Sequence, residues 1–354
     1  MNDGIKRCIS LFFCSVFVVF SVSLVGTARI KRSRSEVFTQ EILPEIQVFE
    51  QEPVFEKTQD EQVILPQHQE DEPVVQIEEM PTISQNTVSE TTLSVLVHDT
   101  NTDKLFEIDF EEYVLGVLLS EMPTSFETEA LKAQAVACRS YALYKSQEKH
   151  KNGAQLCTSP AHCQAFCSPE SVSPERYQKA YDAVYGTKGE IMLFDGNPVL
   201  AVFHASSDRK TRSSQEVWGG SLAYLSSVDT AEAYNPSMNI TKSYTFSKKD
   251  FADRLGISQE TVSAVNIERT ASGRVSLVTF PDKSISGKEL VGLFSLRSQS
   301  FEIEVGENEV VITCGGYGHG VGMSQYGAQD MAQKGYGYKE ILSHYYTGVT
   351  LGYM

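Results

Sequence analysis

Hydrophobic and polar positions divide this chain of 354 residues into three stretches of different character. Residues 9–25 are almost continuously apolar and have basic residues on both sides. Their length lies near the short end of what crosses a bilayer as a helix. We therefore predict a membrane anchor with basic flanks over residues 1–34. A signal peptide cleaved after the small residues Gly26-Thr27-Ala28 is the alternative.

Residues 35–90 show neither helical nor strand periodicity. They contain fourteen Asp or Glu residues and one basic residue, Lys57, so they account for most of the net charge of −16. Prolines interrupt the segment repeatedly, and low hydrophobicity with high charge is typical of disorder. We predict an acidic disordered linker here. The acidity of the chain therefore says little about the ligand of the remainder.

Residues 91–354 have the periodicities of one globular domain. The predicted helices cover 110–120, a following stretch to about 148, 247–255 and 339–346. The predicted strands cover 93–97, 104–108 and 276–280, lie within 302–313, and form a hairpin at 192–203 that turns at 195–197. Because strands and helices do not alternate strictly, the order indicates an α+β fold. We expect mixed helices and antiparallel strands to form a groove.

One carboxylate, Glu121, lies where the first of these helices should end. Pro123 forces Met122 out of helical dihedrals. The stretch from Thr124 to Glu127 has the pattern of a capping box that starts the next helix. A carboxyl at a helix C-terminus meets the negative end of the helix dipole, which favours its protonated form. Such a group could act as a general acid, although a solvated carboxylate in a helix corner is the alternative.

Three cysteines and two histidines are clustered in the following loop. Thiolates and imidazoles at short spacing suit a tetrahedral zinc site, whereas a disulfide is the alternative in an exported protein. Three cysteines do not close into pairs, which favours zinc. The candidate ligands in this loop are His150, Cys157, His162, Cys163 and Cys167.

The C-terminal half offers groups suited to substrate binding. His204 ends a predicted strand, and the glycine-rich stretch 315–327 allows close approach of a ligand. That stretch lacks the Lys-Ser/Thr ending of a phosphate loop and the context of a dinucleotide site. Its Ser324, Gln325 and Tyr326 provide hydrogen bonds and an aromatic surface for a sugar. Trp218 is predicted to anchor the core, and stacking on a glycan ring is the alternative. No basic run with interleaved aromatics supports nucleic-acid binding.

Several ordered motifs are similar to those of the stage II sporulation protein D family, which includes the amidase-enhancer domains. The resemblance covers about residues 93–353. It is carried by Tyr113-Val114-x-Gly116-Val117, Glu121-Met122-Pro123, residues 129–137, Ala161-His162-Cys163-Gln164-Ala165, Phe203-His204, residues 216–220 and residues 318–328. One departure is Ser207-Asp208-Arg209, where many members have a Ser-Gly-Gly-like turn.

This resemblance implies a peptidoglycan lytic transglycosylase. Glu121 would be its general acid and base, and the products would carry 1,6-anhydro-N-acetylmuramic acid ends. The resemblance also implies a structural zinc held by two Cys and two His. Its ligands would be His150, Cys157, His162 and Cys163, with His150 displaced by one residue from the family position. Cys167 would be an additional ligand or a bystander.

The family context implies a single-pass anchor that is not cleaved, with the catalytic domain in the space between mother cell and forespore. There it would remodel septal peptidoglycan during engulfment. The implied partners are glycan strands stripped of peptides, a sporulation amidase and a multispanning membrane subunit. A non-catalytic, glycan-binding amidase activator on the same fold is the alternative. A zinc hydrolase is less favoured, because four protein ligands leave no open metal position.

Overall fold

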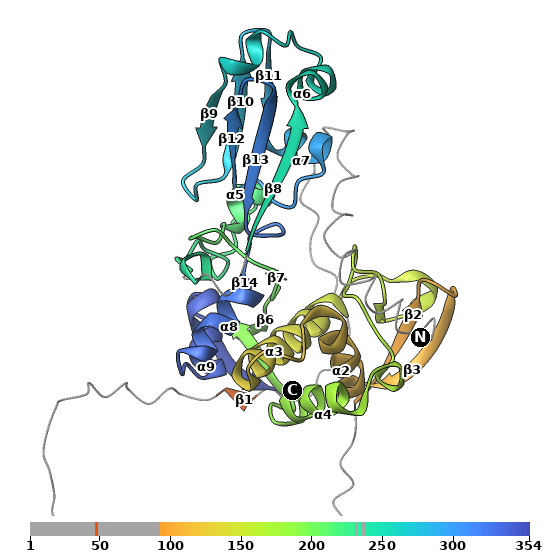
Figure 1. Cartoon of the computed structure of the whole chain (residues 1–354). Helices are drawn as coiled ribbons and strands as arrows, with labels where there is room; N and C mark the ends of the chain where they lie inside the picture. Colours follow the sequence, from red (N-terminus) through yellow and green to blue (C-terminus); the bar gives the residue numbers. More distant parts are fainter. Residues whose placement is uncertain (1–46, 49–92, 231, 236–237, 239) are drawn as a thin grey trace, which may run out of the picture.

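The computed structural model describes residues 47–48, 93–230, 232–235, 238 and 240–354. Its helices and predominantly antiparallel sheets confirm the predicted α+β class. Figure 1 shows two regions, a helical lobe (residues 93–230 and 321–354) and a β lobe (residues 240–315). The predicted anchor and nearly all of the predicted linker lie outside the described residues.

The helical lobe is built around α3, which is buried against elements on several sides. Its helices are α2 (Phe110–Glu121), α3 (Thr128–Lys145), α4 (Pro174–Tyr185), α5 (Ser214–Trp218), α8 (Gln325–Gln333) and α9 (Tyr338–Tyr345). One apolar core joins α2, α3 and α4, and a second joins α3 to α8, α9 and the nearby strands. The small side chains of α3, such as Ala133 and Ala137, let these neighbours approach closely.

The strands of the helical lobe form three small sheets. β2 (Ser94–Asp99) pairs antiparallel with β3 (Lys104–Asp109) and parallel with β4 (Leu156–Cys157). β5 (Glu190–Phe194) lies between β6 (Asn197–Pro198) and β15 (Thr350–Tyr353), which also pairs with β1 (Gln47–Val48). β7 (Phe203–His204) pairs parallel with β14 (Met323–Ser324) and brings distant parts of the chain together.

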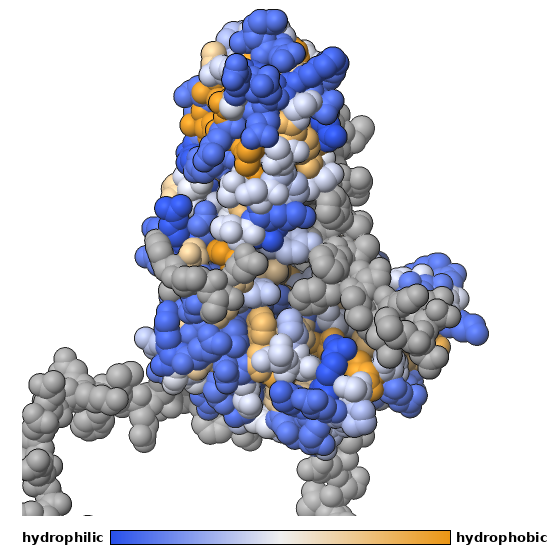
Figure 2. Space-filling model, viewed as in Figure 1, coloured by the Kyte–Doolittle hydropathy of each residue, from blue (hydrophilic) through white to orange (hydrophobic). Residues whose placement is uncertain are grey.

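The β lobe has an apolar core of its own. One sheet contains β8 (Thr241–Ser247), β13 (Glu309–Gly315) and β12 (Phe301–Val305), and the other contains β9 (Asn266–Arg269), β10 (Val275–Phe280) and β11 (Lys283–Ser286). α6 (Lys248–Leu255) and α7 (Gly287–Phe294) pack into this core, where the Phe251 and Phe294 rings stack 4.8 Å apart. Figure 2 shows mainly hydrophilic residues over the tip of this lobe.

A buried ion pair fixes α2 against α3. The Arg139 guanidinium is inaccessible to solvent and donates two hydrogen bonds of 2.9 and 2.6 Å to the two carboxylate oxygens of Glu111. Its remaining donors contact the carbonyls of Glu190 and Val184. Each guanidinium nitrogen therefore makes at least one hydrogen bond, and the buried charge of Arg139 is paired. The ion pair sets the orientation of the helix that ends at Glu121.

Most predicted elements are confirmed, with boundary shifts of a few residues. The capping box is wrong, because α3 begins only at Thr128 and its N-cap, Glu127, makes no side-chain cap bond. Instead the Glu127 N–H donates to Gln329, from the far end of the chain. The second arm of the predicted hairpin leaves its sheet after Pro198. The helices α4, α5, α7 and α8 were not predicted, nor were the strands β1, β4, β8, β9, β11, β14 and β15.

The described residues include no helix with the length and apolar character needed to span a membrane. The predicted division at residues 34 and 90 stays a prediction, and so does a single domain over 91–354. Within that domain the helical lobe and the β lobe each have their own core.

Candidate active site

Glu121 is the last residue of α2, as the position of Pro123 predicted. The chain turns to extended geometry at Met122, whose N–H still bonds to the Leu118 carbonyl. Two distant segments then hold Glu121. The Ala165 N–H donates to its carboxylate Oε1 at 2.9 Å, and the Gln325 side-chain amide donates to its backbone carbonyl at 2.9 Å. The acid is therefore fixed at both its side chain and its backbone.

The carboxyl of Glu121 has a strongly raised pKa. Its surroundings desolvate it and raise the pKa to about 7, while the hydrogen bond from Ala165 acts in the opposite direction. The side chain is nevertheless partly accessible to solvent, so a ligand can reach it. The raised pKa agrees with the sequence prediction. Its cause is burial, whereas the sequence argument invoked the helix dipole.

A buried polar network lies behind the acid. The Gln134 amide donates to the Cys138 sulfur at 3.2 Å and accepts from Gln325 at 3.4 Å. Burial raises the pKa of Cys138 to about 12, so this thiol stays neutral and is not a nucleophile. The network therefore supports the backbone at Glu121 without adding a charge.

Gln164 belongs to this site and was not predicted from the sequence as a functional residue. Its side chain is buried against Cys138, whose thiol it contacts, and no other hydrogen-bond partner reaches its amide among the described residues. The Ser120 hydroxyl, next to Glu121, has no hydrogen-bond partner among the described residues. Unpaired buried polar groups are costly. These side chains are therefore polar groups close to Glu121 in the sequence or in the loop that contacts it, and they could hydrogen-bond to a ligand.

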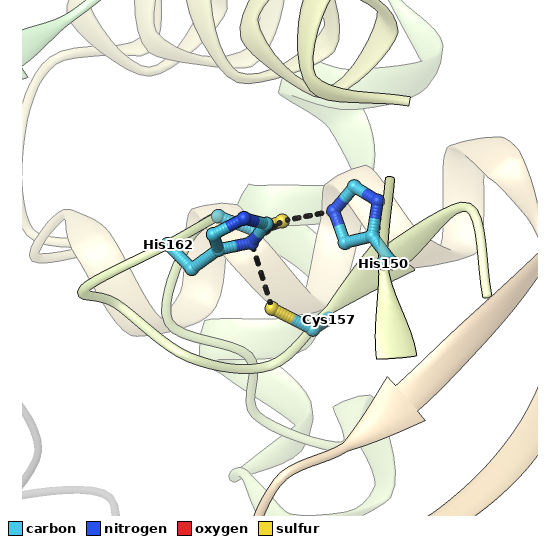
Figure 3. Close-up of side chains that lie close together, drawn as sticks. His150, Cys157 and His162 are labelled. Carbon is cyan, nitrogen blue, oxygen red and sulfur yellow. Dashed lines mark hydrogen bonds between the residues drawn. The ribbon is translucent and has the colours of Figure 1, made fainter. Parts of the chain in front are cut away.

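The predicted metal ligands come together in space. The ligand atoms of His150, Cys157, His162 and Cys163 all lie within 4.8 Å of one another. His150 Nε2 lies 3.0 Å from the Cys163 sulfur, and His162 Nδ1 lies 3.5 Å from each of the two sulfurs. Figure 3 shows the His150 and His162 rings turned toward the sulfur atoms between them.

The donor set fits a tetrahedral zinc ion. Two thiols and two imidazoles within this span are the ligand types that structural zinc takes. A hydrogen bond between the thiols lowers the pKa of Cys157 to about 5 and raises that of Cys163, so one thiolate is already favoured. None of the five cysteines of the described part forms a disulfide. Cys167 lies outside this group, and its sulfur contacts the Ser171 hydroxyl at 3.0 Å.

The cysteine loop also reaches the acid. Cys163 precedes by two positions Ala165, whose N–H bonds to the Glu121 carboxylate. Anything that fixes the loop at Cys163 therefore fixes a hydrogen bond to the candidate acid. The sequence placed both features in the same region but could not show this contact.

Of the predicted substrate-binding residues, His204 and Ser324 are buried. The His204 ring contacts the Ser207 hydroxyl at 2.6 Å and the Val321 carbonyl at 3.1 Å, and burial keeps its pKa well below the usual value. The Ser324 hydroxyl donates to Glu232 at 2.6 Å and caps α8 by accepting from the Gly327 N–H. Neither side chain presents a free surface to a substrate here.

Gln325 and Tyr326 lie closer to the acid. Gln325 is buried and acts on Glu121 through its backbone, so it positions the acid. Tyr326 is partly exposed, and its ring packs edge-on against Phe126 at 5.2 Å. Tyr326 is therefore the one of the four predicted binding residues with accessible surface beside α3.

Comparison with known proteins places these features in a family. The family model described as stage II sporulation protein matches residues 98–194, which include Glu121 and the four metal-ligand candidates. The stage II sporulation protein D of Bacillus amyloliquefaciens is 34% identical over 75% of this chain and 80% of its own length. That of Bacillus subtilis (strain 168) is 30% identical over the same shares. The chain belongs to the stage II sporulation protein D family.

A more distant relative has a different name. The amidase enhancer of Bacillus subtilis (strain 168) is 27% identical over 67% of this chain and 40% of its own length. This chain is therefore also similar to a protein named an amidase enhancer, as the sequence motifs indicated.

The segment Ser207-Asp208-Arg209, which replaces the family's Ser-Gly-Gly-like turn, still has a backbone conformation typical of glycine. Arg209 has a φ of 67°, in the left-handed region that favours glycine. Asp208 accepts a hydrogen bond from Ser300 of the β lobe at 2.6 Å. It also packs so closely on Gly315 that a Cβ there would lie 2.7 Å from its carboxyl carbon. In this member of the family the turn is therefore held by contacts to the β lobe.

The prediction that Trp218 anchors the core is wrong. Its side chain is 43% exposed at the end of α5, and its ring lies 5.8 Å from that of His319. Sequence reasoning treated it as core because a single tryptophan is usually well buried. Whether a five-residue helix is covered depends on packing that local sequence does not encode.

Proposed function

We propose that this protein is a lytic transglycosylase that cleaves the bond between N-acetylmuramic acid and N-acetylglucosamine in peptidoglycan. The observation that carries the proposal is the Glu121 carboxyl. It is partly exposed, held in place by Ala165 and Gln325, and has a pKa of about 7. A group that titrates at neutral pH can both donate and accept a proton there.

In the proposed reaction Glu121 first protonates the glycosidic oxygen, and the bond from that oxygen to the anomeric carbon breaks. The 6-hydroxyl of the same muramic acid residue forms a new bond to the anomeric carbon. The Glu121 carboxylate takes the proton of this hydroxyl and returns to its acid form. The products are a strand with a free 4-hydroxyl and a strand with a 1,6-anhydro end.

This chemistry requires one carboxylate, whereas ordinary glycosidases use two. Burial and the Ala165 hydrogen bond are the influences that shift the pKa of Glu121. The carboxylate of Glu129, eight positions later, pairs with Lys132 at 2.8 Å and accepts a hydrogen bond from the Tyr338 N–H. These contacts give it a structural role. A single acid supports intramolecular attack by the substrate over attack by water.

The pH dependence of the reaction should follow the pKa of Glu121. Because the acid form starts the reaction, we expect kcat/KM to be level below about pH 7 and to fall about tenfold per unit above it. The measurement is the initial rate of release of soluble fragments from peptide-free glycan between about pH 5 and pH 9 at constant ionic strength. A profile that stays level through pH 8 would contradict the assignment of Glu121 as the acid.

We further propose that the four-residue Cys/His group holds a structural zinc ion. Two sulfur and two nitrogen donors would complete its coordination, so zinc would supply folding energy rather than chemistry at the substrate. His150, Cys157 and Cys163 would tie the ends of the loop that leads to Ala165. This role is compatible with catalysis by Glu121 alone.

The setting that the family suggests is also a proposal. The protein would be anchored in the membrane by residues 1–34 and would act on septal peptidoglycan between mother cell and forespore during engulfment. It would act on glycan strands from which a sporulation amidase has removed the peptides, together with a multispanning membrane subunit. Co-purification of the full-length protein with these partners from sporulating cells, and its loss on deletion of residues 1–34, would test this setting.

A non-catalytic function is the second candidate, favoured by the relative that is named an amidase enhancer. In that case the protein would bind glycan and stimulate an amidase without cleaving strands. The two candidates differ in their dependence on Glu121. If the Glu121→Gln protein stimulates amidase as well as the wild type, and the wild type releases no anhydro ends, the activator is the correct function.

A further inference from the structure

Trp218 is the only tryptophan of the chain and lies exposed on the surface. It ends the short helix α5, which lies where the helical lobe meets the base of the β lobe (Figure 1). After it come Gly219 and Gly220, around which an added Cβ would meet no atom within 4 Å. The indole therefore borders open space and has no bulky neighbour on its C-terminal side.

The helix that carries Trp218 is held rigidly. The Ser213 hydroxyl caps it by accepting from the Glu216 N–H, and Gly219 ends it in a left-handed conformation with φ 77°. The Glu216 carboxylate accepts hydrogen bonds from Arg212 and from Ser272 of the β lobe, both at 2.8 Å. An exposed side chain on a backbone fixed at both ends is preorganised to bind.

Trp218 continues into a row of aromatic rings. The His319 ring lies 5.8 Å from the indole and 5.7 Å from the His204 ring. Burial lowers the pKa of His319 to about 4, so this ring is neutral at neutral pH. The row thus has an uncharged surface that ranges from exposed at Trp218 to buried at His204.

The same row connects to the candidate acid. His204 is in β7, which pairs with Met323 and Ser324 of β14. The next residue, Gln325, donates to the carbonyl of Glu121. Each step is a direct contact, so the aromatic row and the acid are parts of one continuous frame.

The surroundings of Trp218 favour a sugar over a protein partner. The exposed large apolar side chains of the described residues are Leu105, Trp218, Leu293, Tyr336 and Tyr353. Of these side chains only Trp218 lies on α5, so none of the others extends its apolar surface along that helix as a protein interface would require. A single rigid ring with open space beside it suits the flat C–H face of one pyranose ring.

We propose that Trp218, oriented by His319, stacks on a sugar ring of the glycan at a subsite away from the cleaved bond. This inference rests on the proposed function, since it takes the glycan as the ligand. Trp218 would contribute to binding of the strand and leave the proton transfers at Glu121 unchanged. Its loss should therefore raise KM and leave kcat nearly the same.

The experiment uses the intrinsic fluorescence of the full-length protein, in which Trp218 is the sole indole. Glu121→Gln protein is titrated with peptide-free glycan strands, so that binding is observed without cleavage. We expect a saturable change in emission intensity or wavelength. In the protein with intact Glu121, Trp218→Ala should raise KM about three- to tenfold, and Trp218→Phe should restore part of the loss.

Tyr336→Ala is the matched control, because Tyr336 is similarly exposed at 45% but lies outside the aromatic row. It should leave KM unchanged. Co-sedimentation with insoluble glycan measures binding independently of the indole. If the protein co-sediments but its emission does not change, and Trp218→Ala has a normal KM, the subsite is refuted while the proposed function stands.

Two other outcomes separate the alternatives. Emission that responds to glycan while the wild type releases no anhydro ends supports the subsite and refutes the transglycosylase. Emission that responds to a purified sporulation amidase, and not to glycan, refutes the subsite and assigns Trp218 to a protein interface.

Discussion

Glu121→Gln should lower kcat/KM for cleavage of peptide-free glycan by about 10²- to 10⁴-fold, the usual contribution of a general acid and base. The amide keeps the shape of the side chain, and its oxygen can still accept from the Ala165 N–H that now bonds to Oε1. It cannot donate an acidic proton to the leaving oxygen. The measurement is the rate of appearance of anhydro-ended fragments by mass spectrometry.

The same substitution should stabilise the fold at alkaline pH. Burial raises the pKa of Glu121 above its usual value, so the folded state binds a proton more tightly than the unfolded state. The resulting stability is present below about pH 4.5 and is lost as pH rises through about 7. Above pH 7 the wild type carries a desolvated charge that the Gln variant lacks. Partial exposure of the side chain limits the gain to less than about 3 kcal/mol.

Glu129→Gln is the matched control for the predicted loss of activity. Glu129 is a nearby carboxylate that bonds to Lys132 and to the Tyr338 N–H, away from the Glu121 contacts. We expect the control to retain activity within about twofold of the wild type. A Glu121→Gln protein that is folded and cleaves glycan at the rate of this control would refute Glu121 as the acid.

Removal of the proposed zinc should destabilise the helical lobe more than any other change to the loop. Purified full-length protein should contain about one zinc per chain, and Cys163→Ser should lose it, because a tetrahedral site tolerates the loss of a thiolate poorly. The loop from His150 to Ala165 would then lose its fixed end. We expect a lower midpoint of thermal unfolding and a lower kcat, because the Ala165 hydrogen bond to Glu121 loosens.

Cys167→Ser provides the comparison, since Cys167 lies in the same loop but outside the four-residue group. It should keep the full zinc content and an unfolding midpoint close to that of the wild type. Metal content is measured by elemental analysis and unfolding by calorimetry, with and without a chelator. Wild-type protein that contains no zinc and unfolds at the same temperature after treatment with chelator would contradict the proposal.

Features that depend on neighbouring residues could be predicted from the sequence. Pro123 ends α2 at Glu121 through a local steric clash, and the observed helix ends there. The Cys/His group could also be predicted, because its members lie in one loop of fourteen residues, from 150 to 163. Short loops bring their side chains together almost regardless of the rest of the fold.

Features that depend on distant contacts could not be predicted in the same way. The capping pattern before α3 failed because Gln329, about 200 positions later, satisfies the Glu127 N–H. Ser324 was predicted to bind substrate because its hydroxyl can form hydrogen bonds. The pairing of β14 with β7 and the contact to Glu232 bury it instead. The exposure of Trp218 likewise follows from how α5 is attached to the β lobe.

The chemical form of the new strand ends tests the central proposal most directly. Wild-type protein is incubated with peptide-free glycan in water enriched in ¹⁸O, and the fragments are analysed by mass spectrometry. We predict fragments with 1,6-anhydro ends, lighter by one water than hydrolysis products and free of ¹⁸O. Reducing ends that carry ¹⁸O would mean that water, and not the 6-hydroxyl of the substrate, attacks the anomeric carbon, and would contradict a lytic transglycosylase.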